Sequence, residues 1–419
     1  MTRRADVDGV AERLTAQLDA RLAAADAALA AGYPGARPGR QPVHTVYVPA
    51  DRYEEDLVGR YGAAARQSIE EHAEAFAAVV GDADIVDRVR AKLASEPVED
   101  LRIDFEDGYV GKGDADEDAD VLRAATALAA SRLSGRAAPF GGIRIKCLEP
   151  ATRRRAIRTL TAFVATLVDH GAGLDGWVVT LPKVTSVDQV EAMLHACGVL
   201  EGELGLAEGT LRFEIQVETP QSILGPDGTA LVARMVHAAG HRLTGLHYGT
   251  YDYSAFCGIA AEQQSLEHPV ADHAKLVMQA AAAGTGVRLS DGSTNVLPVG
   301  DAADIEAAWS NHHRLVRRSL ERGFYQGWDL HPAQLPTRYA ATYAFYREGL
   351  PRALTRLADY TRHTTGGIAD EPATARALAA YLLRGVDCGA VDETEIVSAT
   401  SLGAESLQAL AHYNRPTTA

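Results

Sequence analysis

Short β-rich runs alternate with Ala- and Leu-rich helical stretches along this chain, and this alternation constrains its fold more than any other feature. Eight such runs are present, at 44–50, 101–107, 142–146, 177–184, 212–219, 243–249, 286–293 and 326–332. An open doubly wound sheet usually has fewer units and a Gly-rich first turn. Strand and helix alternating eight times therefore predict an α/β fold of the (β/α)8 type, a TIM barrel.

Helical patterns flank the predicted barrel at both ends. Residues 5–32 are rich in Ala and place apolar side chains three or four positions apart, as an amphipathic helix does, and a Gly- and Pro-rich linker follows. From about Thr337 the pattern is helical to the end of the chain. We therefore predict an N-terminal helix and linker (1–40), a TIM barrel (41–336) and a helical C-terminal extension or lid (337–419). The apolar positions of the first helix are Val7, Val10, Leu14, Leu18 and Leu22.

Composition and charge exclude several classes of protein. With 47% hydrophobic and 23% charged residues, the chain has the composition of a globular protein and not of a disordered one. Its 41 basic and 56 acidic residues give a net charge of -15, which provides no electrostatic footprint for nucleic acid or an anionic membrane. No apolar run approaches the ~18 residues of a membrane span, the start lacks a signal-peptide core, and the cysteines form no CxxC pair. We therefore expect a cytoplasmic protein that binds neither nucleic acid nor membrane.

Polar side chains lie at the ends of nearly all the predicted strands, which is where the active site of a TIM barrel is built. Taken singly, a carboxylate at a strand end is more often a helix cap or part of a surface salt bridge. Their joint placement at one end of one barrel instead favours a single functional site. The residues are Asp104, Glu106 and Asp107 at the end of the second strand, Arg144 and Lys146 in the third, Lys183 after the fourth, Glu218 after the fifth, Asp252 after the sixth, Asp291 after the seventh and His331 after the eighth.

The alternation within the fifth strand indicates which side chains enter the barrel. Side chains on a strand point alternately to its two faces. Glu214, Gln216 and Glu218 therefore share one face, while Phe213 and Ile215 lie on the other. We expect the apolar face to pack on the helices and the polar face to line the lumen.

Several of these segments resemble, in order, the motifs of the citrate lyase β-subunit-like family, also called the HpcH/HpaI aldolase family. The matches span residues 44 to 397, and their combination is more specific than any one of them. The matching segments are VYVPADR (46–52), IDFEDGY (103–109), GIRIK (142–146), TLPKV (180–184), QVETP (216–220), YGTYDYSAFCG (248–258), LHPAQL (330–335) and GAVDETEIV (389–397).

The resemblance implies a barrel of the phosphoenolpyruvate/pyruvate superfamily that binds Mg²⁺, or alternatively Mn²⁺. It also implies a homo-oligomer, a trimer or larger, that makes or breaks a C–C bond in a small carboxylic acid or acyl thioester. Glu218 and Asp252 match the two metal-binding carboxylates of the family, and Arg144 matches the arginine that grips the substrate. Glu106 and Asp107 match the acidic pair near the metal-bound waters.

Asp392 matches, less closely, an aspartate that acts as a general base in some members of that family. It has a second interpretation, because an aspartate directly before Glu393 is also a good N-cap for a helix. The chain departs from the family pattern here, since Glu393 and Thr394 follow Asp392 and the family's proline is missing, and again at Lys146, where the family has asparagine. The resemblance therefore indicates a divergent member of the family, and the substrates of other members are not transferred to this chain.

Three functions remain open on these residues. The first is a metal-dependent C–C lyase or aldolase, in which a cation stabilises an enolate while Arg144, Lys183 and His331 hold the substrate. The second is another reaction on the same barrel, such as malate-synthase-like condensation or phosphoryl chemistry on phosphoenolpyruvate. The third is a non-catalytic binding subunit, against which the presence of both Glu218 and Asp252 argues.

Overall fold

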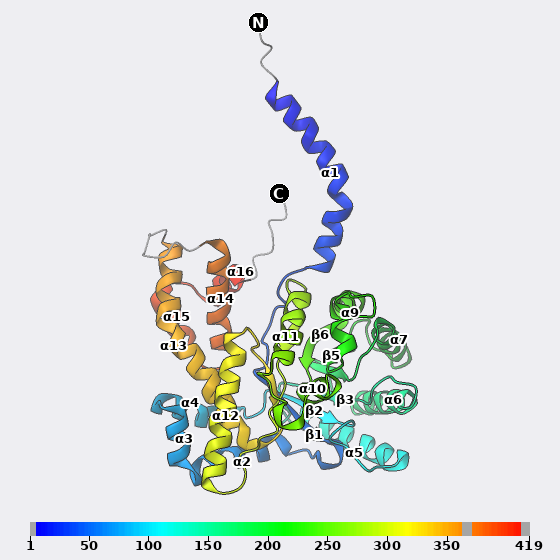
Figure 1. The fold of residues 1–419 in the computed structure, drawn as a ribbon, viewed down its shortest axis with the longest axis vertical. Helices are drawn as coiled ribbons and strands as arrows, with labels where there is room; N and C mark the ends of the chain where they lie inside the picture. Colours follow the sequence, from blue (N-terminus) through cyan, green and yellow to red (C-terminus); the bar gives the residue numbers. More distant parts are fainter. Residues whose placement is uncertain (1–5, 363–370, 412–419) are drawn as a thin grey trace.

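The computed structural model describes residues 6–362 and 371–411, and its centre is a barrel of eight parallel strands (Figure 1). Each strand pairs in parallel with its neighbour, in the order β7-β6-β5-β4-β3-β2-β1-β8. A bridge between Ser290 and Gln326 connects the two ends of this order. The predicted (β/α)8 barrel and all eight of its strand positions are confirmed. The strands are β1 His44–Pro49, β2 Asp100–Asp104, β3 Phe140–Arg144, β4 Trp177–Leu181, β5 Arg212–Val217, β6 Leu243–Tyr248, β7 Arg288–Ser290 and β8 Gly327–Asp329.

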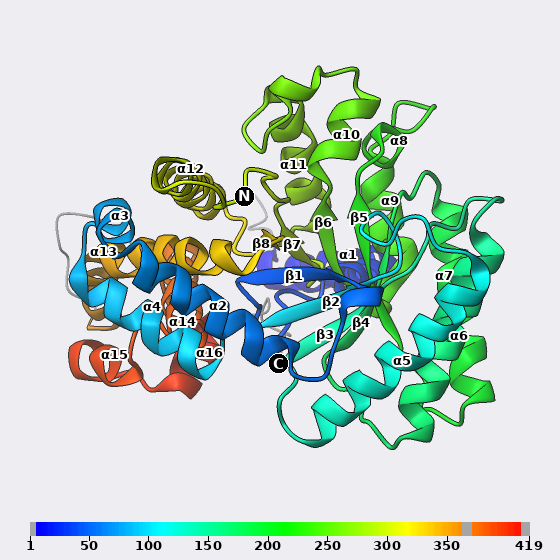
Figure 2. The ribbon, with the colours of Figure 1, turned by 90° about the horizontal axis from the view of Figure 1, so that it is seen from below.

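Helices follow the strands and surround the barrel (Figure 2). Their apolar sides pack on the outer face of the sheet, where Phe213 and Ile215 of β5 are fully buried. Glu214 of the same strand enters the lumen and pairs with Arg102 and His247, as the alternation predicts. The helices are α2 Leu57–Glu71, α3 Ala73–Val80, α4 Ala83–Ser95, α5 Asp114–Leu133, α6 Arg153–Asp169, α7 Val187–Glu203, α8 Pro220–Ile223, α9 Leu231–Ala239, α10 Thr250–Phe256, α11 Pro269–Ala282 and α12 Ala302–Glu321.

The C-terminal part of the chain is helical, as predicted. α13 (Leu335–Thr361) packs on α12 and α4, and it carries α14 (Pro372–Asp387) and α15 (Glu393–Thr400). α16 (Ala404–Ala411) packs on α14. Figures 1 and 2 place α14, α15 and α16 to one side of the barrel, away from α10. The extension therefore does not cover the carboxyl ends of β5 and β6, which a lid would have to do.

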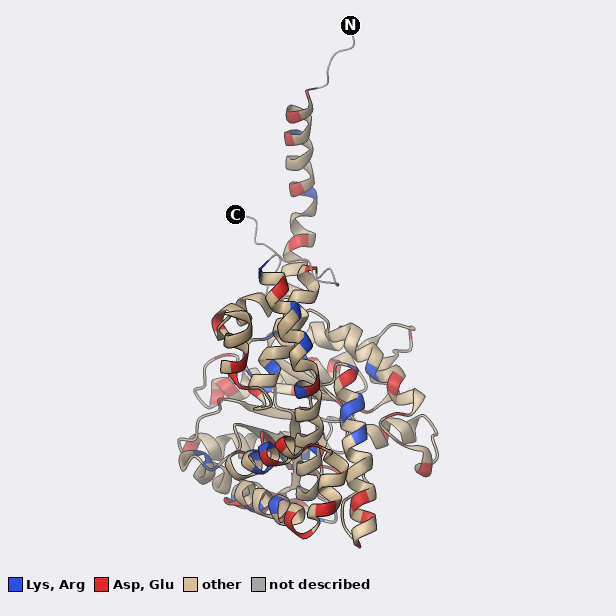
Figure 3. Cartoon of the chain, turned by 90° about the vertical axis from the view of Figure 1, so that its left-hand side faces the viewer, with Lys and Arg blue, Asp and Glu red and all other residues tan. Residues whose placement is uncertain are grey.

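The N-terminal helix α1 (Val7–Gly32) stands away from the barrel (Figure 1). The predicted helix is present, but none of its residues is buried, so its apolar side faces solvent. Acidic and basic residues are distributed along it (Figure 3). Across residues 6–362 and 371–411, no helix combines the length and apolar character that crossing a membrane requires. The division of the chain at residues 40 and 336 stays a prediction.

Candidate metal centre

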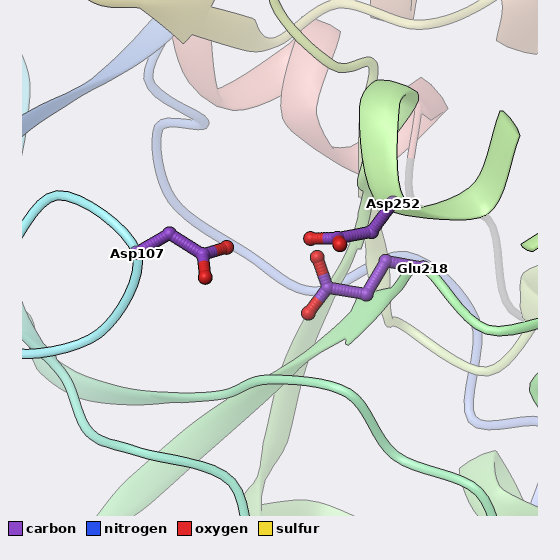
Figure 4. A group of neighbouring side chains, drawn as sticks. All are labelled: Asp107, Glu218 and Asp252. Atoms are coloured by element: carbon purple, nitrogen blue, oxygen red, sulfur yellow. The ribbon is translucent and has the colours of Figure 1, made fainter. Parts of the chain in front are cut away.

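Three carboxylates meet at the carboxyl end of the barrel. They belong to Asp107 in the loop after β2, Glu218 directly after β5 and Asp252 in the first turn of α10, which follows β6. One oxygen of each lies within 4.8 Å of the others, and Figure 4 shows the three side chains pointing toward one another. The structure thus brings together the two metal ligands expected from the sequence and one member of the expected acidic pair.

The close approach of β5 to the start of α10 depends on a glycine. Gly249 ends the β6 run, and its N–H donates to the carbonyl of Val217 at 2.9 Å. A Cβ atom at Gly249 would lie 2.5 Å from the Cβ of Glu218 and 2.8 Å from its Oε2. Because real side chains do not tolerate such distances, only glycine leaves room for the Glu218 carboxylate at this position.

Lys183 is the cation nearest to these carboxylates. Its Nζ donates to Glu106 at 2.6 Å and to Asp107 at 2.8 Å, and it lies 3.2 Å from an oxygen of Asp252. Its backbone N–H donates to Glu218 at 2.7 Å. The residue has a φ of 51°, a left-handed conformation that is uncommon outside glycine and often retained at functional sites. One residue thereby contacts all four acidic side chains of the site.

The positive charges of Lys183 and Arg144 do not balance the four carboxylates of the site. Burial raises the pKa of Glu218 to about 8, with Glu106 and Asp252 adding to the rise and Lys183 opposing it. Burial likewise raises the pKa of Glu106 to about 7, against the lowering effect of Arg144 and Lys183. A buried carboxylate resists ionisation unless a cation compensates it. Oxygen donors held close together, with excess negative charge, fit a hard divalent cation such as Mg²⁺.

Arg144 on β3 is buried beside the carboxylates, but most of its guanidinium is already engaged. Its Nε and Nη2 donate to Asp104 at 2.7 and 2.6 Å. Its Nη1 donates to Gln216 at 3.3 Å and lies 3.5 Å from Glu106, while the guanidinium carbon sits 4.9 Å from the ring centre of Tyr47. Burial would lower the pKa of Arg144, and Asp104 more than offsets this and raises it. Only Nη1 faces the acidic cluster, so a bidentate grip on substrate would require Asp104 to yield.

The structure does not bring the other two expected residues into the cluster. His331 caps the short 3-10 helix Pro332–Gln334, where its Nδ1 accepts from Ala333 N–H at 3.2 Å, and burial lowers its pKa. Asp392 stands at the N-cap position of α15, where its backbone N–H donates to Glu395 at 3.0 Å, and its carboxylate pairs with Arg88 of α4 at 2.9 Å. The structure places Asp392 at the position of an N-cap, but its carboxylate accepts from Arg88 and from no backbone N–H of α15.

Three residues that build the site were given no role in it by the sequence analysis. Asp104 orients Arg144, Gln216 bridges Arg144 and Glu218, and Tyr47 lies against the guanidinium. Two signals could have found them. Gln216 lies on the polar face of β5, and Asp104 stands in the same acidic run as Glu106. Nothing in the β1 run distinguished Tyr47.

Comparison with models of known families identifies the family of this chain. The profile of a domain of unknown function, DUF6986, matches residues 22–415. The chain belongs to this family. The match begins within α1 and includes the barrel and most of the C-terminal extension. No curated protein matches the chain significantly.

Solved structures of similar fold include a citrate lyase from Burkholderia xenovorans. It is 20% identical, with a TM-score of 0.57 over 87% of this chain and 98% of that protein. A malate synthase from Haloferax volcanii, solved as a magnesium/glyoxylate complex, is 13% identical, with a TM-score of 0.50 over 90% of this chain and 100% of that one. These likenesses confirm the fold that the sequence resemblance implied, a (β/α)8 barrel.

Proposed function

We propose that this protein is a metal-dependent enzyme that cleaves or forms a C–C bond beside a carbonyl, through an enolate of a small 3-hydroxy or 2-oxo acid or its thioester. The observation that carries the proposal is the convergence of Asp107, Glu218 and Asp252 around Lys183 at the carboxyl end of the barrel. The shared fold with the Burkholderia citrate lyase supports the reaction class.

Asp107, Glu218 and Asp252 would hold the metal, for which we propose Mg²⁺ or Mn²⁺. The donor set contains only carboxylate oxygens, which these hard cations prefer. The Haloferax malate synthase was solved with magnesium, which supports this choice. When bound, such a cation supplies electrostatic stabilisation for negative charge that develops on a carbonyl oxygen.

The chain's own cations would bind the substrate. Lys183 Nζ and Arg144 Nη1 both lie at the edge of the carboxylate cluster and can donate to a substrate carboxylate. Glu106 accepts from Lys183 and lies beside Arg144, so it holds the two cations in place. In our proposal, neither His331 nor Asp392 contacts the substrate that is bound in the barrel of the same chain.

Enolate formation can be tested without knowing the natural substrate. We expect the protein with Mg²⁺ to exchange the methyl protons of pyruvate for deuterium in D₂O, followed by NMR. Glu218→Gln should abolish the exchange, whereas Glu191→Gln, which makes the same change at an exposed position on α7, should not. Absence of exchange with pyruvate, oxaloacetate or acetoacetate in a protein that binds the metal would contradict the proposal and favour a non-catalytic barrel.

A condensation reaction is a second candidate, favoured by the likeness to the Haloferax malate synthase. It would use the same enolate in the bond-forming direction, with a thioester and a 2-oxo acid as substrates. Product formation from an acyl thioester and glyoxylate, without ATP, would support it. A requirement for ATP would instead indicate phosphoryl chemistry.

A further inference from the structure

The surface of α1 carries an unbroken apolar line that the barrel does not cover. Its side chains follow one another at steps of three or four residues, and positions 7, 18 and 29 are eleven residues apart. This spacing, about 3.67 residues per turn, nearly equals the period of an α-helix, so the line runs almost straight. Leu14, Leu18 and Leu22 are 52%, 52% and 46% exposed. We call this line the apolar stripe; it comprises Val7, Ala11, Leu14, Leu18, Leu22, Ala25 and Leu29.

We propose that α1 pairs in parallel with α1 of a second copy of this chain, through the apolar stripe. A solitary helix in water gains nothing from its apolar side chains, and most helical stability in proteins comes from packing such a side against a partner. A stripe that extends over nearly the whole of Val7–Gly32 fits another helix of the same length, because both partners then bury it from end to end.

The charges beside the stripe select the parallel orientation. At 100° per residue, Asp8, Asp19 and Asp26 lie on one side of the apolar stripe and Arg21 lies on the other, while Arg13 lies on the back of the helix. In a parallel pair related by a two-fold axis along the helices, the acidic side of one helix faces the basic side of its partner. In an antiparallel pair, the acidic sides face each other.

One specific ion pair follows from this arrangement. Arg21 and Asp26 flank the stripe on opposite sides and are five residues apart. This is the spacing at which residues beside the seam of a parallel coiled coil meet across the two helices. A symmetric pair would therefore contain two Arg21–Asp26 ion pairs between the copies.

The same chain's barrel cannot serve as the partner without rearrangement of the linker. Gly35 N–H donates to the carbonyl of Gly284 at 2.8 Å, and Arg37 donates to the carbonyl of Leu243 at 2.8 Å. Tyr33, at the end of α1, stacks edge-on against His237 with ring centres 5.1 Å apart. These contacts fix the base of α1 so that the helix points away from the barrel (Figure 1).

A membrane surface is also a poor partner. Helices that lie in a lipid interface carry Lys and Arg on their polar face. Val7–Gly32 contains four acidic residues and only two arginines, with no lysine. An anionic bilayer would repel this polar face.

The test is sedimentation of the full chain by analytical ultracentrifugation. We expect self-association that Leu18→Asp together with Leu22→Asp weakens at least tenfold, while the circular dichroism of the barrel is unchanged. The control Leu122→Asp, at an exposed leucine on α5, should leave association as it was. A wild-type chain that is monomeric at micromolar concentration, or association unaffected by the double substitution, would overturn the proposal.

Charge reversal tests the register. Arg21→Asp and Asp26→Arg should each weaken association several-fold, and the two together should restore it, because the opposite charges then exchange places. The orientation is read from Ala11→Cys made together with Cys257→Ser, which removes the exposed native thiol. A parallel pair brings spin labels at position 11 of the two copies together, whereas labels about 20 Å or more apart would indicate an antiparallel pair and overturn the assignment.

Discussion

Lys183 takes part in the same interactions that a bound cation would make with these carboxylates. Its ammonium lies 2.8 Å from Asp107 and 3.2 Å from Asp252, two of the three proposed ligands. Replacing it with an uncharged side chain leaves the acidic cluster without its nearest cation. We therefore expect Lys183→Met to bind Mg²⁺ more tightly than the wild type, by several-fold in a calorimetric titration, and to lose catalytic activity.

The backbone at Lys183 is left-handed, so a substitution could also act by changing the loop. Methionine has the same unbranched stem as lysine and meets the same backbone conformation, which makes it the matched replacement. Weaker Mg²⁺ binding in Lys183→Met would contradict the competition between this ammonium and the metal.

Arg144 combines a structural and a functional role. Its two-pronged contact with Asp104 satisfies a buried carboxylate, and lysine keeps the charge but cannot reproduce the fork. We expect Arg144→Lys to lower the free energy of unfolding by about 1–3 kcal/mol and to reduce kcat/KM at least tenfold. A change of less than fivefold in kcat/KM, with the stability loss present, would show that Arg144 is purely structural.

A substitution at Asp392 distinguishes a structural role of this residue from a role as catalytic base. Because its carboxylate pairs with Arg88, and α15 lies to the side of the barrel (Figure 2), its negative charge has no role in our proposed site. Asparagine caps a helix nearly as well as aspartate. We therefore expect Asp392→Asn to leave kcat unchanged and the melting temperature nearly so. A fall in kcat of roughly 100-fold with an intact fold would restore its assignment as a general base.

At the scale of elements, the junction of β6 and α10 determines whether there is room for the Glu218 side chain beside residue 249. A methyl group at position 249 would overlap Glu218, so Gly249→Ala should displace the carboxylate and weaken Mg²⁺ binding at least tenfold. The control is Gly198→Ala in α7, where an added Cβ meets no atom within 4 Å. That change should be neutral or stabilising, by about 0.5–1 kcal/mol. Equal metal affinity in both variants would show that the junction tolerates a side chain.

The elements that the sequence predicted well are those with a strong local signal. All eight strands were located, because buried parallel strands are short apolar runs between helices. The alternation within β5 correctly placed Glu214 in the lumen. The same alternation in residues 142–146 would place Lys146 on the polar face beside Arg144, but β3 ends at Arg144, and Lys146 pairs with Glu117 of α5.

Tertiary partners were harder to predict than elements. The convergence of Glu218 and Asp252 follows from their places at the ends of neighbouring strands, so the barrel alone brings them together. The engagement of Arg144 by Asp104 depends on side-chain geometry that no spacing encodes. The helical extension was recognisable from its composition, but its position at the side of the barrel depends on packing between α13, α12 and α4.

At the scale of the whole molecule, a partly buried histidine makes stability depend on pH. Burial lowers the pKa of His313 on α12 to about 4, with Arg317 and His312 adding to the effect. The unfolded chain, with a histidine pKa near 6.5, therefore binds more protons than the folded chain between these values. The contribution of neutral His313 to the free energy of unfolding is fully present above pH 6.5, and it is lost as the pH falls toward 4.

We therefore expect the melting temperature to fall as the pH decreases from 7 to 5, and His313→Gln to reduce this fall. The protonation of His313 accounts for about 2 kcal/mol at pH 5. Thermal unfolding followed at several pH values measures the difference. An identical pH dependence in the wild type and in His313→Gln would contradict this assignment.

The central claim is that the three carboxylates at the mouth of the barrel hold one divalent cation. Calorimetric titration of the full chain with Mg²⁺ tests it most directly, using Glu218→Gln and Asp252→Asn with Asp188→Asn, an exposed aspartate on α7, as the matched control. We predict one Mg²⁺ per chain in the wild type and in the control, and no measurable binding in either site variant, with all four proteins folded. Unchanged Mg²⁺ affinity in both Glu218→Gln and Asp252→Asn would contradict the account.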